Sequence, residues 1–204
     1  MTLATSSIND ILAAAEALFS EHGYAAVSMA QVAQASGISK SNIYHHFSSK
    51  DDLYTSVLRH ACQDTLKQVQ QLSASQGDSI EQLRHFSIHH FQHLHQKSRI
   101  TKLILRELLD GGHEHSRLLA QQVFHEVSLQ LKSLIQKGQE QHYIRNDMDA
   151  HHIAASMVAL NIFLFQSWPI LEHLPNSTFT ENTNSQSMLF DILLNGFARP
   201  NTPH

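Results

Sequence analysis

Side chains able to donate and accept hydrogen bonds crowd a short stretch near the N-terminus. Hydroxyl, ammonium, amide and imidazole groups follow one another there, with hardly an apolar residue between them. Such groups suit phosphate oxygens, and a lysine, an asparagine or a histidine can also meet the edges of bases in a DNA major groove. Base contacts would fall to Lys40, Asn42 and His45. The whole stretch comprises Ser39, Lys40, Ser41, Asn42, Tyr44 and His45.

The residues just before and within this stretch have the spacing of a helix-turn-helix. Counting from Met29, the small Ala33 is fifth, Gly37 is ninth and the β-branched Ile43 is fifteenth. A small residue lets the second helix cross closely, a glycine accepts the positive φ of a tight turn, and an inward isoleucine fixes the second helix to the first. The second helix, predicted over 39–46, would then present its polar residues to a major groove. From these positions alone, a tight corner of two helices without any ligand stays open.

The longer run from Gly37 to Leu53, GISKSNIYHHFSSKDDL, resembles the signature of the TetR family of regulators. The resemblance covers about 45 residues, from Ile8 to Leu53. It implies that 39–46 is a recognition helix, that Tyr44 reaches a phosphate and that Lys50 clamps another. Ser28 stands where the family has a hydroxyl residue that hydrogen-bonds the DNA backbone.

The same resemblance implies partners and an architecture. It implies a homodimeric repressor that grips a palindromic double-stranded DNA operator and is released by a small-molecule effector. It also implies a helix-turn-helix domain followed by a larger helical domain for ligand binding and dimerisation, which we place at 1–50 and 51–204. No cofactor is expected.

The charge balance of the N-terminal region departs from this family. The chain of 204 residues has a formal net charge of −4. Residues 1–60 contain three basic residues, the first of them Lys40, against five acidic ones, and so a net charge of −2. Since phosphate attraction normally leaves a basic footprint, non-specific DNA affinity should be weak. A helical binding protein with weak DNA affinity therefore remains the alternative.

Apolar spacing is helical almost throughout, and no alternating run predicts a strand. We expect an all-α protein of about nine helices. Serine–glutamine pairs at Ser28/Gln31 and Ser79/Gln82 have the form of capping boxes that begin helices. Ser73 to Asp78 reads as a linker, and Gly111–Gly112 and Pro169 as helix ends. The predicted helices run from Ser7 to Gly23, from Ser28 to the turn at Gly37, and over 39–46, 48–72, 80–95, 98–110, 115–141, 150–168 and 184–198.

Aromatic and aliphatic residues of the larger region are candidates for lining a ligand cavity, because small apolar ligands occupy aromatic-lined pockets. Ordinary core packing is the alternative for each and the more common role of aromatic residues at helical spacing. The candidates are Phe86, Phe91, Leu103, Phe124, Phe163 and Trp168.

The last two predicted helices resemble in placement the pair through which TetR-family subunits associate. Their apolar residues are therefore candidates for a dimer contact, with packing inside the same chain as the alternative. The candidates are Ile153, Met157, Leu160, Leu164, Met188, Ile192 and Leu193.

Histidines raise a further possibility. His85, His89 and His93 recur every fourth residue and so share one face of a helix, and imidazole nitrogens bind zinc, copper and nickel. A solvated polar face is the favoured interpretation in a chain with 17 histidines, and a metal-responsive repressor stays open. No metal site is predicted.

Other classes fit poorly. His125–Glu126 lacks the second histidine of the zinc-protease motif, and no catalytic serine motif or glycine-rich phosphate loop occurs, so no enzyme is expected. The single cysteine, Cys62, forms no disulfide within the chain, and residues 1–7 lack the layout of a secretory signal. The longest apolar run, Ile153 to Phe165, is shorter than a membrane span of about 20 residues. These observations predict a cytoplasmic protein without a membrane partner.

Overall fold

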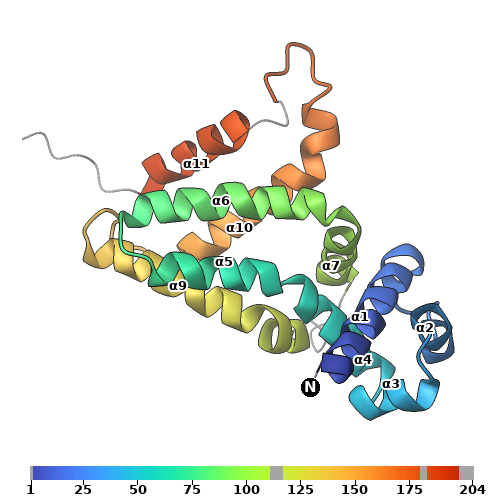
Figure 1. Cartoon of the computed structure of the whole chain (residues 1–204). Helices are drawn as coiled ribbons and strands as arrows, with labels where there is room; N and C mark the ends of the chain where they lie inside the picture. Colours follow the sequence, from blue (N-terminus) through green and yellow to red (C-terminus); the bar gives the residue numbers. More distant parts are fainter. Residues whose placement is uncertain (1, 111–116, 180–182, 198–204) are drawn as a thin grey trace, which may run out of the picture. The chain divides into compact units, whose positions relative to one another are not determined.

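The computed structural model describes residues 2–110, 117–179 and 183–197, and within them the chain is helical with no strand (Figure 1). The predicted all-α class is confirmed. Gly111–Gly112, predicted as a helix end, lies outside the described residues. The helices are α1 (Thr2–His22), α2 (Met29–Ser36), α3 (Lys40–His46), α4 (Lys50–Ala61), α5 (Gln63–Ala74), α6 (Ser79–Gln96), α7 (Ser98–Asp110), the π-helical turn η1 (Ala120–Phe124), α9 (His125–Glu140), α10 (Ala150–Leu171) and α11 (Thr183–Phe197).

The chain divides into two compact units. The head unit comprises Met1–Gln63 and Lys97–His125, and the body unit comprises Asp64–Gln96 and Glu126–His204. Packing thus groups a later segment, which contains α7 and η1, with the N-terminal helices. The functional division expected at residue 50 stays a prediction.

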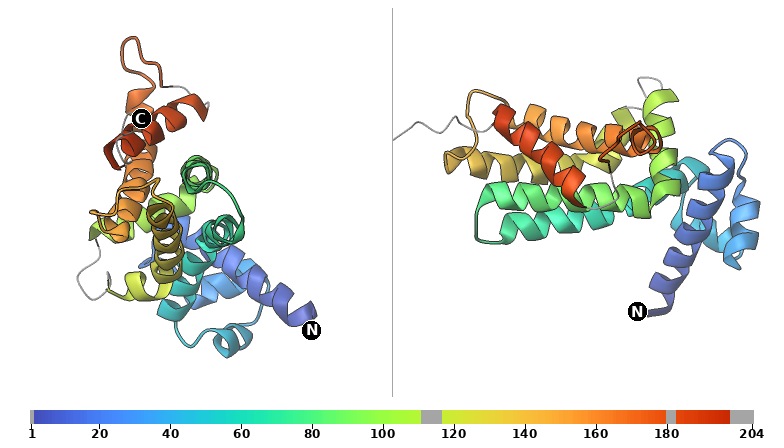
Figure 2. Two further views of the ribbon diagram at one scale, coloured as in Figure 1. Left: turned by 90° about the vertical axis from the view of Figure 1, so that its left-hand side faces the viewer. Right: turned by 90° about the horizontal axis from the view of Figure 1, so that it is seen from above.

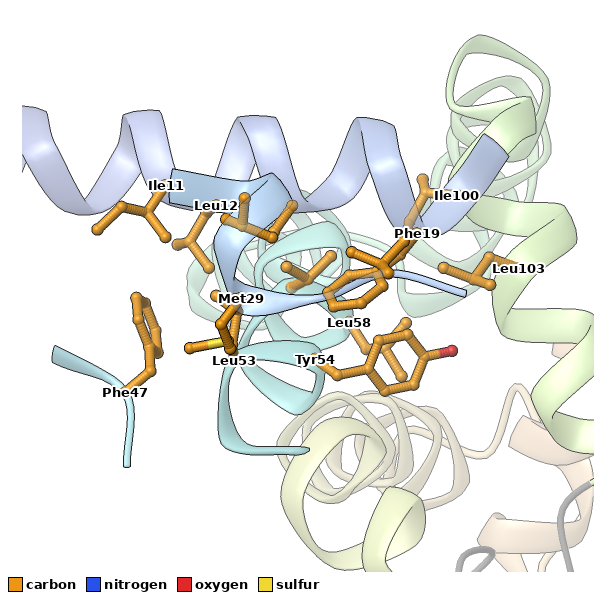
Figure 3. Packing of buried hydrophobic residues seen from close by; sticks show 14 of the residues in the cluster. Ile11, Leu12, Phe19, Met29, Phe47, Leu53, Tyr54, Leu58, Ile100 and Leu103 are labelled. Atoms are coloured by element: carbon orange, nitrogen blue, oxygen red, sulfur yellow. The ribbon is translucent and has the colours of Figure 1, made fainter. Parts of the chain in front are cut away.

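A single hydrophobic cluster holds the head unit together (Figure 3). The apolar stripe of α1 supplies Ile11 and Phe19, and α4 supplies Leu53 and Leu58, all of them almost completely buried. Burying each such side chain contributes roughly 1.5–3 kcal/mol. Members from α7 and the segment after it close the cluster: Ile100, Leu103, Leu119 and Val123. The packing therefore joins segments that are far apart in sequence.

The body unit is a bundle in which α6 contacts both α10 and α11 (Figure 2). Residues of α5 and α9 complete the main hydrophobic cluster of the body unit. The Arg84 guanidinium of α6 lies 2.7 Å from the Asp191 carboxylate of α11 and stacks on the ring of Phe190, which ties these two helices together. The buried residues of the cluster include Val69, Phe86, Leu131, Leu134, Ile153, Met157 and Phe190.

Several predicted helix ends differ from the structure. The helix predicted to continue from 48 to 72 is interrupted at Cys62, which separates α4 from α5, although no glycine or proline marks that point. The first helix begins at Thr2 and not after Ser7. The helix that was to end at Pro169 runs on to Leu171, with the proline inside its last turn. The linker predicted at Ser73–Asp78 is confirmed over 75–78, between α5 and α6, whereas Ser73 and Ala74 still belong to α5.

The second predicted capping box is wrong. The Asp78 carboxylate, and not the Ser79 hydroxyl, accepts the backbone N–H of Ile80, at 2.8 Å. Gln82 uses its side-chain amide to reach back to Ser75, at 2.8 Å from that hydroxyl. An aspartate is as good an N-cap as a serine, and here it precedes the serine by one residue.

The 22-residue α10 is the one helix of the described chain that is long and apolar enough to cross a membrane by length and composition alone. It is longer than the apolar run seen in the sequence. Core helices meet the same criterion, and eight α10 side chains are buried against the rest of the body unit. The absence of a membrane partner stays a prediction.

Candidate DNA-binding interface and ligand cavity

The turn between α2 and α3 is fixed by capping interactions at three consecutive points. At the start of α2, the Ser28 backbone N–H donates to the Gln31 side-chain oxygen at 2.8 Å, and Ser28 accepts the Gln31 N–H in return, as predicted. Gly37 ends α2 with φ of +69°, the left-handed conformation that glycine adopts without a steric penalty. Ser39 then caps α3 by accepting the Asn42 N–H at 3.2 Å. The predicted helix-turn-helix is confirmed.

One inward side chain holds α3, and the others are exposed. Ile43 is completely buried in the head cluster, whereas the Tyr44 side chain beside it is 46% exposed. The Lys40 ammonium lies 5.9 Å from the centre of the Tyr44 ring, so these two groups share one exposed face. The predicted DNA-contacting residues that face solvent are Ser28, Ser39, Lys40, Ser41, Asn42, Tyr44 and His45.

Lys50 is half-buried, and its ammonium has contacts within the chain. It donates to the Ala25 carbonyl at 3.4 Å and lies 4.2 Å from the centre of the Tyr24 ring. The Tyr24 hydroxyl donates in turn to the Asp51 carboxylate. Burial and this hydrogen bond raise the Tyr24 pKa to about 12, so the phenol keeps its proton. These contacts hold the Lys50 ammonium against the loop between α1 and α2.

Sequence reasoning missed the part that Tyr24 plays here. The Lys50–Ala25 contact joins residues 25 positions apart, and no local periodicity encodes such a pairing.

The acidic residues at the start of α4 have a structural role. Asp51 accepts the Tyr24 hydroxyl, and the carboxylate of the next residue, Asp52, accepts the Ser48 N–H at 2.8 Å. Two of the acidic residues that make the N-terminal region negative thus stabilise the start of α4, where carboxylates interact favourably with the helix dipole.

A cavity of about 300 Å³ lies within the body unit, between α6, α10 and α11. The rings of Phe91 and Trp168 meet edge to face, with centres 5.3 Å apart. Trp168 is 3% exposed and Gln186 is 4% exposed. The cavity is lined by Phe91, Gln92, His95, Gln96, Trp168 and Gln186.

The six predicted ligand-lining residues do not come together. Phe91 and Trp168 line the cavity. Phe86 is buried in the main body cluster, whereas Leu103 and Phe124 belong to the head cluster. Phe163 is 62% exposed on α10. His95 and the three glutamines of the lining were not predicted, because polar residues on a helix carry no sign that they face a cavity.

The predicted dimer residues fall into three groups by burial. Ile153, Met157 and Leu164 are buried inside the body unit, so they contribute little surface to a partner. Met188 and Ile192 are each 66% exposed on α11. Leu160 and Leu193 are half-buried.

The histidine stripe of α6 contains two exposed residues, His85 and His89, and the half-buried His93. Over 2–110, 117–179 and 183–197, no three histidine, cysteine or acidic side chains come together in a way that could hold a metal ion. The adjacent His90 is buried instead, and its Nδ1 lies 3.1 Å from the Asn161 amide nitrogen. Burial, with help from His93 and His89, lowers the His90 pKa to about 4, so this imidazole is neutral.

Comparison with known families matches both regions of the chain. Residues 11–57 match the family described as "Bacterial regulatory proteins, tetR family". Residues 80–192, more than half of the chain, match "Tetracyclin repressor-like, C-terminal domain".

Individual relatives agree with these matches. The chain is 36% identical over 74 residues to the HTH-type transcriptional activator FasR of Mycolicibacterium smegmatis, covering 36% of this chain and 34% of the relative. It is 34% identical over 70 residues to the HTH-type transcriptional repressor KstR2 of Rhodococcus jostii, covering 34% of each. The chain thus spans about a third of the length of these relatives.

A solved structure extends the likeness to the whole fold. The transcriptional regulator FadR from Bacillus subtilis, in complex with stearoyl-CoA, superposes with a TM-score of 0.73 at 16% identity, over 92% of this chain and 95% of that one. At this identity the likeness concerns the fold alone. Together with the capped α2–α3 turn and the two family matches, it shows that the chain belongs to the TetR family of bacterial regulatory proteins.

Proposed function

We propose that this protein is a transcriptional repressor that binds an inverted-repeat operator as a homodimer and is released by a small molecule bound in its body unit. One observation supports the DNA-binding part of this proposal. The polar side chains of α3 are exposed together, while buried Ile43 and the caps at Ser28 and Ser39 fix the helix behind them. A recognition helix needs this combination, because base readout requires a helix that is held in place and polar side chains that are exposed.

Roles within the interface follow from chemistry. The Tyr44 hydroxyl and the Lys50 ammonium suit phosphate oxygens, and the contact with Ala25 orders the lysine before DNA arrives. Lys40, Asn42 and His45 would read base edges. Ser28, Ser39 and Ser41 would add backbone contacts from hydroxyl groups.

The regulatory part rests on the cavity and on an exposed apolar surface. A small molecule shifts DNA affinity only when it binds one conformation better than another, so the cavity would have to differ between the DNA-bound and released states. Exposed Met188 and Ile192 of α11, with Phe163 of α10, would form the contact between two copies. Two related subunits then suit an inverted repeat. Such a protein works in the cytoplasm, where the DNA lies.

Selection from randomised duplex DNA with the full chain, at low salt, tests this function. We expect an enriched inverted repeat whose half-sites are spaced by about one helical turn or a multiple of it. The Asn42→Ala variant should change the enriched sequence, and Gln71→Ala, on the exposed surface of α5, serves as the matched control. Recovery of no repeat would overturn the DNA-binding proposal. Transcription from a template that carries the repeat then separates repression from activation.

A further inference from the structure

We propose that the cavity between α6, α10 and α11 binds a small, uncharged aromatic molecule that carries both a hydrogen-bond acceptor and a hydrogen-bond donor. The inference rests on the proposed function for its regulatory consequence, because binding there would matter to transcription only if the protein binds DNA. The binding itself depends on the cavity alone.

The walls of the cavity favour an aromatic ring. Phe91, His95 and Trp168 form a cluster in which the ring centres of Phe91 and His95 are 4.5 Å apart and those of His95 and Trp168 are 5.9 Å apart. Aromatic rings gain additional attraction from edge-to-face and offset contacts with one another. A volume of about 300 Å³ is at the lower end of small-molecule sites and admits one ring or two fused rings.

Two buried polar atoms specify the hydrogen bonds of the ligand. Within the described residues, neither the Trp168 indole N–H nor the Gln186 side-chain oxygen has a hydrogen-bond partner. Both residues line the cavity and are almost completely buried. An unsatisfied buried polar group is costly, and a partner that supplies the missing hydrogen bond recovers that cost. The indole N–H therefore calls for an acceptor on the ligand, and the glutamine oxygen calls for a donor.

The lining also disfavours a charged ligand. The described residues around the cavity include glutamines and aromatic residues but no lysine, arginine, aspartate or glutamate. A carboxylate or an ammonium placed there would lose its hydration without gaining a fixed counter-charge. Neutral amide side chains, in contrast, exchange hydrogen bonds with a neutral polar molecule.

A set of three probes of nearly equal shape tests the assignment on the full chain. Benzamide has a ring, an acceptor and a donor; benzoate replaces the amide by a charge; and acetophenone keeps the acceptor but lacks the donor. Trp168 is the only tryptophan of the sequence, so its fluorescence reports on the cavity directly. We expect benzamide to change this fluorescence saturably, benzoate to bind at least about tenfold more weakly, and acetophenone to bind several-fold more weakly. Equal affinities for benzamide and benzoate, or no binding of benzamide at all, would overturn the proposal.

Variants identify the atoms involved. Gln186→Met removes the acceptor at nearly constant volume, and we expect it to weaken benzamide about tenfold while leaving acetophenone unchanged. The same exchange at exposed Gln71 is the matched control and should change neither. Trp168→Phe removes the indole N–H, and calorimetry with this variant should show weaker binding of both benzamide and acetophenone. Benzamide affinity that is equal in the parent, Gln186→Met and Trp168→Phe proteins would place binding elsewhere and overturn the assignment.

Operator binding measured on the same samples separates this proposal from the proposed function. Saturable, Gln186-dependent benzamide binding supports the cavity assignment whether or not DNA is bound. A protein that binds benzamide in this way but selects no DNA sequence would overturn the proposed function and leave the cavity assignment standing. A protein that binds DNA sequence-specifically but does not bind benzamide would overturn the cavity assignment and leave the proposed function standing.

Discussion

The Tyr54 hydroxyl of α4 donates a hydrogen bond of 2.7 Å to the Glu107 carboxylate of α7, 53 positions further along the chain. Tyr54 is 2% exposed, and its ring meets Phe19 edge to face at 4.9 Å. Burial and the hydrogen bond to Glu107 raise the Tyr54 pKa far above its usual range, so the phenol remains a donor. This contact fastens α7 to the helix that follows the helix-turn-helix.

Tyr54→Phe should therefore destabilise the head unit. A buried hydrogen bond to a charged group contributes roughly 1.5–3 kcal/mol, whereas the ring packing would be preserved. Chemical denaturation followed by circular dichroism measures the loss. Glu107→Gln keeps an acceptor and should cost less, and Tyr143→Phe at an exposed tyrosine should cost almost nothing. Equal stabilities of the Tyr54→Phe and Tyr143→Phe proteins would show that this hydrogen bond contributes no net stability.

The helix-turn-helix could be predicted from the sequence because local rules determine it. Ser28, Gly37 and Ser39 act within four residues of the groups they cap, and Ile43 follows from helical periodicity. Long-range packing could not be predicted in this way. The Tyr54–Glu107 contact and the cavity that brings Gln186 close to Phe91 depend on which helices pair, and a periodic pattern does not specify its partner. The break at Cys62 has no local signal either.

Gly138→Ala should destabilise the body unit, although alanine is normally favoured over glycine in a helix by about 1 kcal/mol. A Cβ atom at this position would lie 2.7 Å from the Ile144 Cδ1 atom and 2.9 Å from the Ser79 hydroxyl oxygen. Overpacking of this kind costs roughly 1–3 kcal/mol, so crowding outweighs helix propensity. Thermal unfolding followed by Trp168 fluorescence measures the effect. Shortening Ile144 to valine in the same chain should recover part of the loss, and a more stable Gly138→Ala protein would disprove the crowding argument.

The stability of the body unit should fall as the pH drops from about 6.5 towards 4. The folded protein holds His90 neutral with a pKa of about 4, whereas the unfolded chain protonates it near its ordinary value of 6.5. The unfolded state therefore binds more protons in this window, and stability is lost on the order of 2–3 kcal/mol by pH 4. Denaturation at a series of pH values, followed by Trp168 fluorescence, measures the slope.

Two variants test whether His90 causes this slope. His90→Gln keeps a side-chain acceptor for the Asn161 amide but has no ionisable group, so its slope should be smaller than that of the parent. His85→Gln changes an exposed histidine of the same helix that does not contribute to the His90 pKa shift, and it should retain the parent slope. Identical slopes for the two variants would remove His90 as the cause.

Two substitutions on α3 should have different effects on DNA binding. Tyr44→Phe removes a hydroxyl predicted to contact phosphate, so affinity should fall about equally for matched and mismatched operators. Asn42→Ala should instead relax the preference at one position of each half-site, where a bidentate contact contributes about 1–3 kcal/mol of discrimination. Binding titrations on a set of operators with single base changes distinguish the two patterns. Unchanged base preference in Asn42→Ala would exclude Asn42 from base readout.

Lys50→Ala should weaken operator binding regardless of sequence and lower the slope of log affinity against log salt by about one. Because the Lys50 ammonium also contacts Ala25 and the Tyr24 ring, a loss of affinity could arise from a displaced α1–α2 loop. Lys50→Met keeps most of the aliphatic stem without the charge, and Tyr24→Phe keeps the ring without the hydroxyl. A salt slope that falls in Lys50→Met and not in Tyr24→Phe assigns the effect to a phosphate contact, and a parental slope in Lys50→Met excludes that contact.

The association of two copies should depend on the exposed faces of α10 and α11. Phe163 and Ile170 are seven residues apart and share one face of α10, and Met188 and Ile192 are four apart on α11. These four side chains are between 62% and 68% exposed, which is unusual for large apolar groups and typical of an interaction surface. Replacing Ile192 by glutamate would place an unpaired carboxylate in that surface, at a cost of several kcal/mol if it becomes buried.

We therefore expect Ile192→Glu to be a folded monomer with reduced operator affinity, because one head contacts only half of an inverted repeat. Light scattering, circular dichroism and operator binding on the same samples measure these properties. Ile153→Glu is the contrasting variant: its carboxylate would enter the buried body cluster, so it should unfold the protein and not merely separate the subunits. Glu140→Gln, at the end of α9, is the control. This variant should stay dimeric. An Ile192→Glu protein that is folded and dimeric would place the subunit contact on another surface.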